Sequence, residues 1–298
     1  MSAVLPGQPQ SVAGRLPWFL ALLGFTAMYL PSYWDAAQGV WQTDEMAHGP
    51  IVLGVVMWAL WQVRGALARA ERAPAPGLGW PLFATGLVLY ALARIFVIGS
   101  IEFASQLFIV VGGLLLLHGL PALRAAWFPV AYMAFLIPLP ASFVNTVTGP
   151  LKHWISVIVV DALHLAGLPI ARSGVTISIG PYQLLVADAC SGLNSMFGLA
   201  AIGALFMFIM RRRGWLHNAL MLASILPIAF VANIVRVACL VLITYEFGDE
   251  AGQGFLHGAA GLLLFVVALT MLFALDAAIA AVLRRDGRGA VAAPPAAP

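Results

Sequence analysis

Three side chains in the second half of the sequence together supply the chemistry of acyl transfer: Cys190, Arg236 and His257. A thiolate can attack a carbonyl carbon, an imidazole can carry a proton to the leaving group, and a guanidinium can stabilise the developing oxyanion. The combination indicates a cysteine-peptidase-like site if the fold brings the three residues to one place.

The cysteine stands where a polar loop ends and an apolar run begins, in the stretch Ala187-Asp188-Ala189-Cys190-Ser191-Gly192-Leu193-Asn194. A thiol in the first turn of a helix faces unpaired backbone N–H groups and the positive end of the helix dipole, and both favour the thiolate. Asp188 is a candidate N-cap and alternatively a residue that orients His257. Ser191 and Asn194 are candidate supporting residues in the same turn.

Other roles for the cysteines stay open. Cys190 could instead be a small buried residue, which is the role expected for Cys239, deep inside an apolar run. The two cysteines could also form a single disulfide, which the sequence does not decide.

Arginine within an apolar run is costly, about 2.5–3.5 kcal/mol at the centre of a membrane, so it needs a partner or a water-lined cavity. Arg236 is such a residue, and Asn233 lies one helical turn before it on the same face. Arg94 is a second one, close to Glu102. This second pair either joins two helices or reads the substrate.

His257 opens the last apolar run and is followed by small residues that allow close helix approach. At that position it could act as a general base and then as a general acid. The other histidines lack metal-ligand spacing, although His48 and Asp44 are four residues apart. The sequence therefore predicts no metal and no cofactor.

The composition predicts a membrane protein. Of 298 residues, 62% are hydrophobic and 9% are charged, against roughly 25% charged in a soluble domain. The apolar residues form blocks long enough to cross a bilayer, and they predict eight transmembrane helices: Pro17–Tyr33, Gly49–Val63, Trp80–Ile98, Phe103–Leu120, Ala125–Leu139, Ser191–Met210, Trp215–Tyr245 and His257–Leu283.

The basic residues sit mainly at the ends of these blocks, which indicates topology anchoring on the cytoplasmic side rather than nucleic-acid binding. With Arg124 and the 211–213 cluster both inside, an even number of crossings separates them. Leu151–Leu168 then does not cross, and lies along the outer interface or re-enters the membrane. Both termini are cytoplasmic in this topology, and the three candidate catalytic residues share a depth near the outer surface.

The fold class that follows is an all-α integral membrane protein with about eight transmembrane helices. A long outer connection, 140–189, carries an interfacial helix and a short β-hairpin, Val175–Ile179 and Tyr182–Val186 around Gly180-Pro181. Residues 1–16 are expected to form a cytoplasmic tail, residues 17–284 one multi-pass domain, and residues 285–298 a disordered cytoplasmic tail.

The ordered motifs resemble those of the exosortases, in the exosortase/archaeosortase family of membrane-embedded transpeptidase-like proteins. The resemblance rests on Ala189-Cys190-Ser191-Gly192 opening a helix, Ala232-Asn233-x-x-Arg236, and His257-Gly258, and it extends from Thr43 to Leu283. The first outer loop, Trp41 to Pro50, resembles the exosortase B subgroup.

This resemblance implies a thiol protease or transpeptidase in which Cys190 is the nucleophile, Arg236 stabilises the oxyanion or positions the substrate, and His257 is the general acid and base. Its substrates would be secreted proteins with a C-terminal Pro-Glu-Pro signal (PEP-CTERM), a transmembrane helix and a basic tail. The new C-terminus would pass to an unknown acceptor at the periplasmic face of the bacterial inner membrane, in a system often linked to exopolysaccharide. The partners are thus substrate proteins and membrane lipids, not nucleic acid.

Two other functions compete with this interpretation. A transporter or flippase for a lipid-linked sugar would place Arg94, Glu102 and Arg236 in a polar cavity, but the sequence lacks the paired broken helices typical of inverted repeats. A metal-dependent intramembrane protease would need a paired metal-ligand motif, and the sequence contains none.

Overall fold

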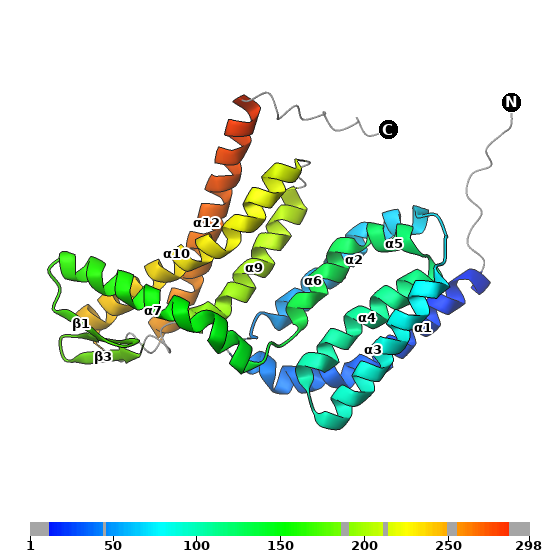
Figure 1. The fold of residues 1–298 in the computed structure, drawn as a ribbon, viewed down its shortest axis with the longest axis horizontal. Helices are drawn as coiled ribbons and strands as arrows, with labels where there is room; N and C mark the ends of the chain where they lie inside the picture. Colours follow the sequence, from blue (N-terminus) through cyan, green and yellow to red (C-terminus); the bar gives the residue numbers. More distant parts are fainter. Residues whose placement is uncertain (1–11, 44–45, 186–190, 211–213, 249–254, 286–298) are drawn as a thin grey trace. The chain divides into compact units, whose positions relative to one another are not determined.

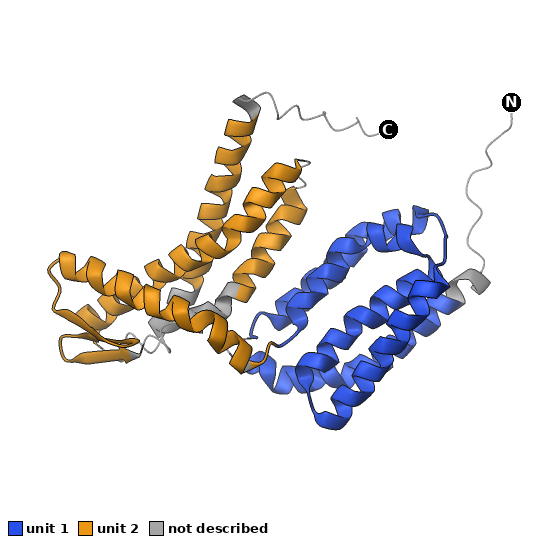
Figure 2. Cartoon of the chain, in the orientation of Figure 1, with its two compact units in different colours: residues 1–138 blue, residues 139–298 orange. Residues whose placement is uncertain are grey.

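The computed structural model describes residues 12–43, 46–185, 191–210, 214–248 and 255–285, and Figure 1 shows the order of its elements. The chain divides into two compact units, residues 1–138 and residues 139–298 (Figure 2). Each unit contains its own cluster of buried apolar side chains, so each is considered by itself.

The regular secondary structure described in unit 1 is helical, apart from one isolated backbone bridge between residues 73 and 119. Its elements are α1 (Val12–Gln38), η1 (Val40–Gln42), α2 (Gly49–Arg69), α3 (Pro76–Phe96), α4 (Gly99–Leu117), α5 (Leu120–Ala125), α6 (Trp127–Tyr132) and η2 (Met133–Leu136).

Helices α3 and α4 form a tightly packed hairpin because small residues line the contact. The buried residues of α3 are Gly79, Gly86 and Ala93, spaced seven apart and therefore on one face. From α4, Gly112 approaches so closely that a Cβ atom there would lie 2.6 Å from the backbone nitrogen of Phe83. Small residues at such positions let two backbones meet in lipid, where no hydrophobic force drives the helices together.

The predicted span Ala125–Leu139 is not one continuous helix. It is divided among the end of α5, α6 and η2, with a break at Ala126. Pro129 explains the break, since proline has no N–H to donate to the carbonyl of residue 125 and its ring crowds that carbonyl. All three short elements pack against α2.

Unit 2 combines four helices with a small sheet in its described part. The elements are α7 (Ala141–Leu165), β1 (Ile170–Ser173), β2 (Thr176–Ile179), β3 (Tyr182–Leu185), α9 (Ser191–Met210), α10 (Trp215–Phe247) and α12 (Phe255–Arg285). The interfacial helix predicted at Leu151–Leu168 corresponds to α7, which begins at Ala141, well before the expected start.

The predicted hairpin around Gly180-Pro181 is confirmed, with Ile179 paired to Tyr182 across the turn. The sheet has a third strand, β1, antiparallel to β2, which the sequence did not predict. Strand β1 escaped notice because only its first residue, Ile170, is buried, so its sequence shows no alternation of apolar and polar residues.

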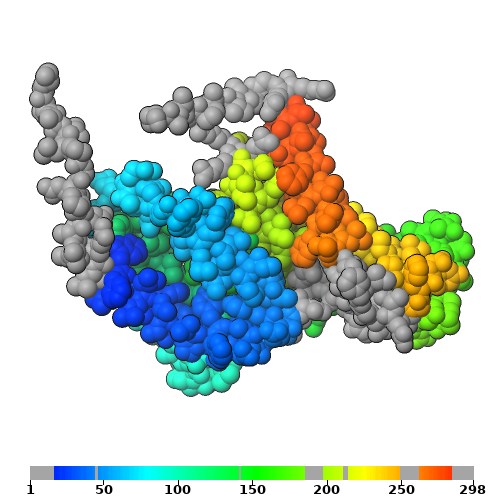
Figure 3. Space-filling model, turned by 180° about the vertical axis from the view of Figure 1, so that it is seen from behind, coloured from blue at the N-terminus to red at the C-terminus, as the bar shows by residue number. Residues whose placement is uncertain are grey.

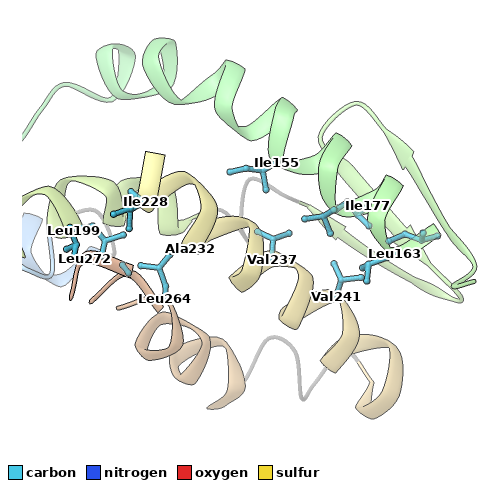
Figure 4. Packing of buried hydrophobic residues seen from close by; sticks show 14 of the residues in the cluster. Ile155, Leu163, Ile177, Leu199, Ile228, Ala232, Val237, Val241, Leu264 and Leu272 are labelled. Atoms are coloured by element: carbon cyan, nitrogen blue, oxygen red, sulfur yellow. The ribbon is translucent and has the colours of Figure 1, made fainter. Parts of the chain in front are cut away.

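Helix α10 lies at the centre of unit 2. In Figure 4 it carries Ala232, Val237 and Val241 between the other elements. The surrounding members of the cluster come from α7, the sheet, α9 and α12: Ile155, Leu163, Ile177, Leu199, Leu264 and Leu272. Every element of the unit thus packs directly or indirectly on α10, which carries Arg236.

Five helical segments within the described residues are long and apolar enough to cross a membrane: Gly49–Arg69, Pro76–Phe96, Gly99–Leu117, Trp215–Phe247 and Leu262–Leu283. Two apolar segments, Trp127–Leu136 and Phe197–Met210, are shorter. The exposed faces of the spans carry large apolar side chains, as on α2, blue in Figure 3, where Ile51 is 70% exposed and Trp61 58%. The protein is therefore a multi-pass membrane protein, while the expected count of eight crossings stays a prediction.

The close approach of α3 and α4 predicts opposite effects of alanine at two neighbouring glycines. Gly112→Ala is expected to destabilise unit 1 by about 1–3 kcal/mol, because the added methyl group meets the Phe83 backbone. Gly113→Ala is the matched control, because a Cβ atom at that position would have no other atom within 4 Å and alanine favours helix by about 0.5–1 kcal/mol. Thermal unfolding of both variants in detergent tests the prediction, and equal Tm values would contradict it.

Candidate functional site

Arg236 is buried inside unit 2, so its side chain does not face the lipid. Its side chain is on the buried face of α10, where the residue is 4% exposed, and Asn233, one turn earlier, is fully buried. The predicted shared face of these two residues is therefore observed. A guanidinium held among the helices of the unit can interact with a group developing negative charge there.

An apolar helix begins directly after Cys190, as the sequence predicted: α9 starts at Ser191. Cys190 and Asp188 themselves lie outside the described residues. Ser191 and Asn194 belong to the first turns of α9, and His257 is the third residue of α12. Their helical backbones are described, and their side chains are not.

A buried pair of side chains joins the first turn of α10 to the C-terminal part of α12, far from Arg236 and His257 along the two helices. The Nε2 atom of His217 lies 2.8 Å from Oδ1 of Asp276, and the two residues are 4% and 6% exposed. Helices α10 and α12 are consecutive and run in opposite directions (Figure 1). The interval from His217 to Arg236 along α10 equals the interval from His257 to Asp276 along α12. Arg236 and His257 therefore both lie about 28 Å from the pair along their helices.

Two further contacts show how α9 is aligned along its axis with α10 and α12. The first is between Gly203 of α9 and Ile225 of α10, where a Cβ atom on the glycine would lie 2.8 Å from the Ile225 Cδ1 atom. The interval from Ser191 to Gly203 is longer by a single residue than the interval from Ile225 to Arg236. Because these helices also run in opposite directions, Ser191 and Arg236 lie at nearly the same depth.

The second contact pairs Phe206 of α9 with Phe273 of α12, whose ring centroids are 4.9 Å apart. The interval from Ser191 to Phe206 is shorter by a single residue than the interval from His257 to Phe273. The three helix contacts thus agree to within one residue, about 1.5 Å along a helix. Counted in residues along the helices, they assign Ser191, Arg236 and His257 to one level. The meeting of these residues in space, and of the Cys190 and His257 side chains, stays a prediction.

The His217–Asp276 pair was missed in the sequence. The available signal was Asp276 itself, a carboxylate within an apolar run, because such a group requires a partner inside the protein. Its partner could not be chosen from sequence, since His217 is 59 residues away and only the packing of α12 on α10 brings the two together.

Arg94 and Glu102 form the pair that the sequence indicated. The Arg94 Nη1 atom lies 3.1 Å from Oε1 of Glu102, and it is also 3.1 Å from Oδ2 of Asp35, which was not anticipated. The chain reverses between them at Val97, which has a left-handed backbone conformation with φ 56°. Ser32 of α1 donates a hydrogen bond to the same Glu102 oxygen.

Two further hydrogen bonds continue this contact between α1 and α4. Tyr29 Oη lies 2.6 Å from Ser105 Oγ, and Tyr33 Oη donates to Gln106 Oε1 at 2.7 Å. Arg94 therefore closes one end of a polar contact within unit 1, which favours the structural role over substrate reading.

The loop before α2 contains one half-buried histidine, His48. Burial lowers the pKa of His48, and a hydrogen bond with the backbone of Phe135 partly opposes the shift. Its expected neighbour Asp44 lies outside the described residues. Within the residues that the structure describes, no three His, Cys, Asp or Glu side chains are grouped so as to hold a metal ion.

The arrangement around Glu102 predicts that neutralising Arg94 and neutralising Asp35 lower the stability of unit 1 by different amounts. Arg94→Gln is expected to destabilise unit 1 by about 1–3 kcal/mol, because the buried Glu102 carboxylate loses its cation. Asp35→Asn is expected to cost less than about 1 kcal/mol, because the Asp35 side chain is 64% exposed. Thermal unfolding in detergent distinguishes the two. Unchanged stability of Arg94→Gln together with altered substrate choice would instead support a role in reading the substrate.

Comparison with known proteins gives one match. A family model described as a transmembrane exosortase (Exosortase_EpsH) matches residues 40–274. No curated protein and no solved structure matches the chain. The family match includes α9, α10 and His257, and it covers well over half of the chain. The protein therefore belongs to the transmembrane exosortase family.

Proposed function

We propose that this protein is a membrane-embedded cysteine protease or transpeptidase that cleaves the C-terminal sorting signal of secreted proteins. The observation that carries the proposal is a set of three helix contacts from which the first turn of α9, Arg236 and the first turn of α12 are nearly equally distant, counted in residues. Membership of the exosortase family supports the reaction class.

In the proposed reaction the Cys190 thiolate attacks the carbonyl carbon of the scissile peptide bond. The carbonyl oxygen becomes an oxyanion, which the Arg236 guanidinium stabilises. When the C–N bond breaks, the protonated imidazole of His257 donates its proton to the leaving amine, and a thioester with Cys190 remains. Water or an acceptor amine then attacks the thioester, His257 takes up its proton, and the thiolate leaves.

The neighbouring residues have proposed supporting roles. Asn233 shares the buried face of Arg236 and can hold the guanidinium in place or contact the substrate. Asp188 caps α9 or orients His257, and Ser191 and Asn194 complete the first turns of that helix. Helix α9 begins directly after Cys190, so the thiol would feel the positive end of the helix dipole.

The substrate we propose is a secreted protein whose C-terminus carries a Pro-Glu-Pro signal, a transmembrane helix and a basic tail. That helix would dock from the side, within the bacterial inner membrane, and present the peptide bond at the periplasmic surface. Both termini of the enzyme would then be cytoplasmic. A substrate anchored by its own helix arrives at a fixed depth, which suits a site whose three parts share one level.

If the Cys190 thiol is the nucleophile, replacing Cys190 and replacing Cys239 are expected to have very different effects on substrate processing. With Cys190→Ala, processing of a tagged secreted protein bearing the Pro-Glu-Pro signal is expected to fall at least about 10³-fold, because the nucleophile is lost. Cys239→Ala is the control, since Cys239 is the second cysteine of the chain, is partly buried within α10 and has no role in the proposed reaction. Accumulation of precursor in cells at matched membrane levels is the measurement. Normal processing by Cys190→Ala would exclude cysteine chemistry, and absence of processing by the wild-type protein as well would favour a transporter.

The proposed role of Arg236 predicts that the rate of the reaction depends on the planar geometry of the guanidinium as well as on its positive charge. Arg236→Lys keeps the positive charge but loses the planar fork of donors. It is expected to lower kcat about 10²-fold with little change in KM, because the lost interaction forms only in the transition state. Kinetics with a purified signal-bearing substrate in detergent test this. A raised KM at unchanged kcat would assign Arg236 to substrate binding instead.

A further inference from the structure

We propose that His217 and Asp276 are positioning residues that set the register of α12 against α10, and so the depth at which the first turn of α12 meets Arg236. The catalytic part of this inference rests on the proposed function. The register itself is a property of unit 2 and can be measured without any activity.

The pair is suited to this role because it is directional and almost excluded from solvent. One imidazole nitrogen meets one carboxylate oxygen at 2.8 Å, and both residues are more than nine-tenths buried. A slip of α12 by one turn, about 5.4 Å, would separate these atoms and leave a carboxylate without this partner inside a membrane protein. Removing one partner of a buried polar pair leaves the other without it and is destabilising, so the paired register is preferred.

The apolar part of the described contact between the two helices is less selective. The buried residues that α10 and α12 contribute to the core between them are aliphatic, and several are alanines: Ile228, Ala229, Ala232, Leu264, Ala268 and Leu272. Apolar side chains of similar size can repack at a small cost, and they specify a register less sharply than a hydrogen bond does. Among the described contacts between α10 and α12, the pair is therefore a directional one that distinguishes one register from its neighbours.

The register matters at the far end of the helices. Arg236 and His257 are equally distant from the pair, counted in residues along α10 and α12. If α12 slips along α10 as a rigid helix, the first turn of α12 moves past Arg236 by the same amount as Asp276 moves past His217. One residue of slip is about 1.5 Å. A misplacement of about 1 Å can cost about 10²-fold in the rate of an enzymatic reaction.

Stability and register can be separated by experiment. Replacing both members of a buried ion pair with well-packed apolar residues is often neutral or stabilising, whereas removing one member is destabilising. The variant His217→Leu with Asp276→Leu is therefore expected to keep the wild-type Tm while losing the directional contact. The exchanged variant, His217→Asp with Asp276→His, restores the same chemical pair in the opposite order.

Kinetics on the full-length protein in lipid nanodiscs then test the role. The double leucine variant is expected to lower kcat about 10–100-fold with little change in KM and Tm, and the exchanged variant is expected to recover most of kcat. A double leucine variant with wild-type kcat would overturn the positioning role even though Cys190-dependent processing remained. A failure of the proposed function would appear differently, as processing that does not depend on Cys190.

A distance measurement decides the register directly and needs no substrate. Spin labels are placed at Leu242 of α10 and Leu262 of α12, which are 37% and 68% exposed, with Cys190 and Cys239 replaced by alanine. The double leucine variant is expected to shift or broaden the distance distribution by about 1.5 Å or more, and the exchanged variant to restore it. A distribution identical to that of the native pair would overturn the inference, whatever the activity assay shows.

Discussion

The exclusion of charge from lipid is the constraint on which the arrangement of both units depends. Glu102, Arg236 and Asp276 are buried ionisable residues within helices that are long enough to cross a membrane. A charged group in such a helix must face the protein interior and meet a partner there. Glu102 meets Arg94 and Ser32, and Asp276 meets His217. Each pair fixes which faces of two helices must meet, and apolar side chains then fill the remaining contact.

The same constraint explains why part of the fold could be predicted. Apolar runs bounded by arginines identify the spans because lipid requires long uncharged helices, and Gly180-Pro181 identifies the hairpin because few other residues suit its turn. Arg94 and Glu102 could be paired because they flank one short reversal of the chain. The helix that begins after Cys190 could be predicted from the change from polar to apolar residues.

What could not be predicted depends on contacts between distant segments. Asp35 and Asp276 were visible as carboxylates, but their partners are decided by how α1 packs on α3 and how α12 packs on α10. Strand β1 is recognisable only from its pairing with β2. For the candidate site, the sequence suggested the three residue types and the structure adds the helix register. The register follows from contacts such as Phe206 with Phe273, which no local pattern reveals.

The proposed site, with three helix segments at one depth, would have a simple relation to a membrane-anchored substrate. Both the enzyme and a substrate of that kind are held by the bilayer, so sideways diffusion brings them together without any search along the membrane normal. Specificity then depends on where along the normal the reacting groups lie, as well as on the side chains that contact the signal. Within unit 2, the close contact of Gly203 with Ile225 holds α9 against α10.

The broken segment formed by α5, α6 and η2 has a consequence for how the chain enters the membrane. Its apolar part, Trp127–Leu136, would be only about 15 Å long as regular helix, about half of the hydrocarbon thickness. Pro129 also supplies no N–H to the carbonyl of Ala125, and lipid cannot supply one in its place. This segment therefore cannot be inserted as an independent helix. It requires α2, against which it packs, to be in the bilayer first, so the order of synthesis along the chain is also the order in which unit 1 can assemble.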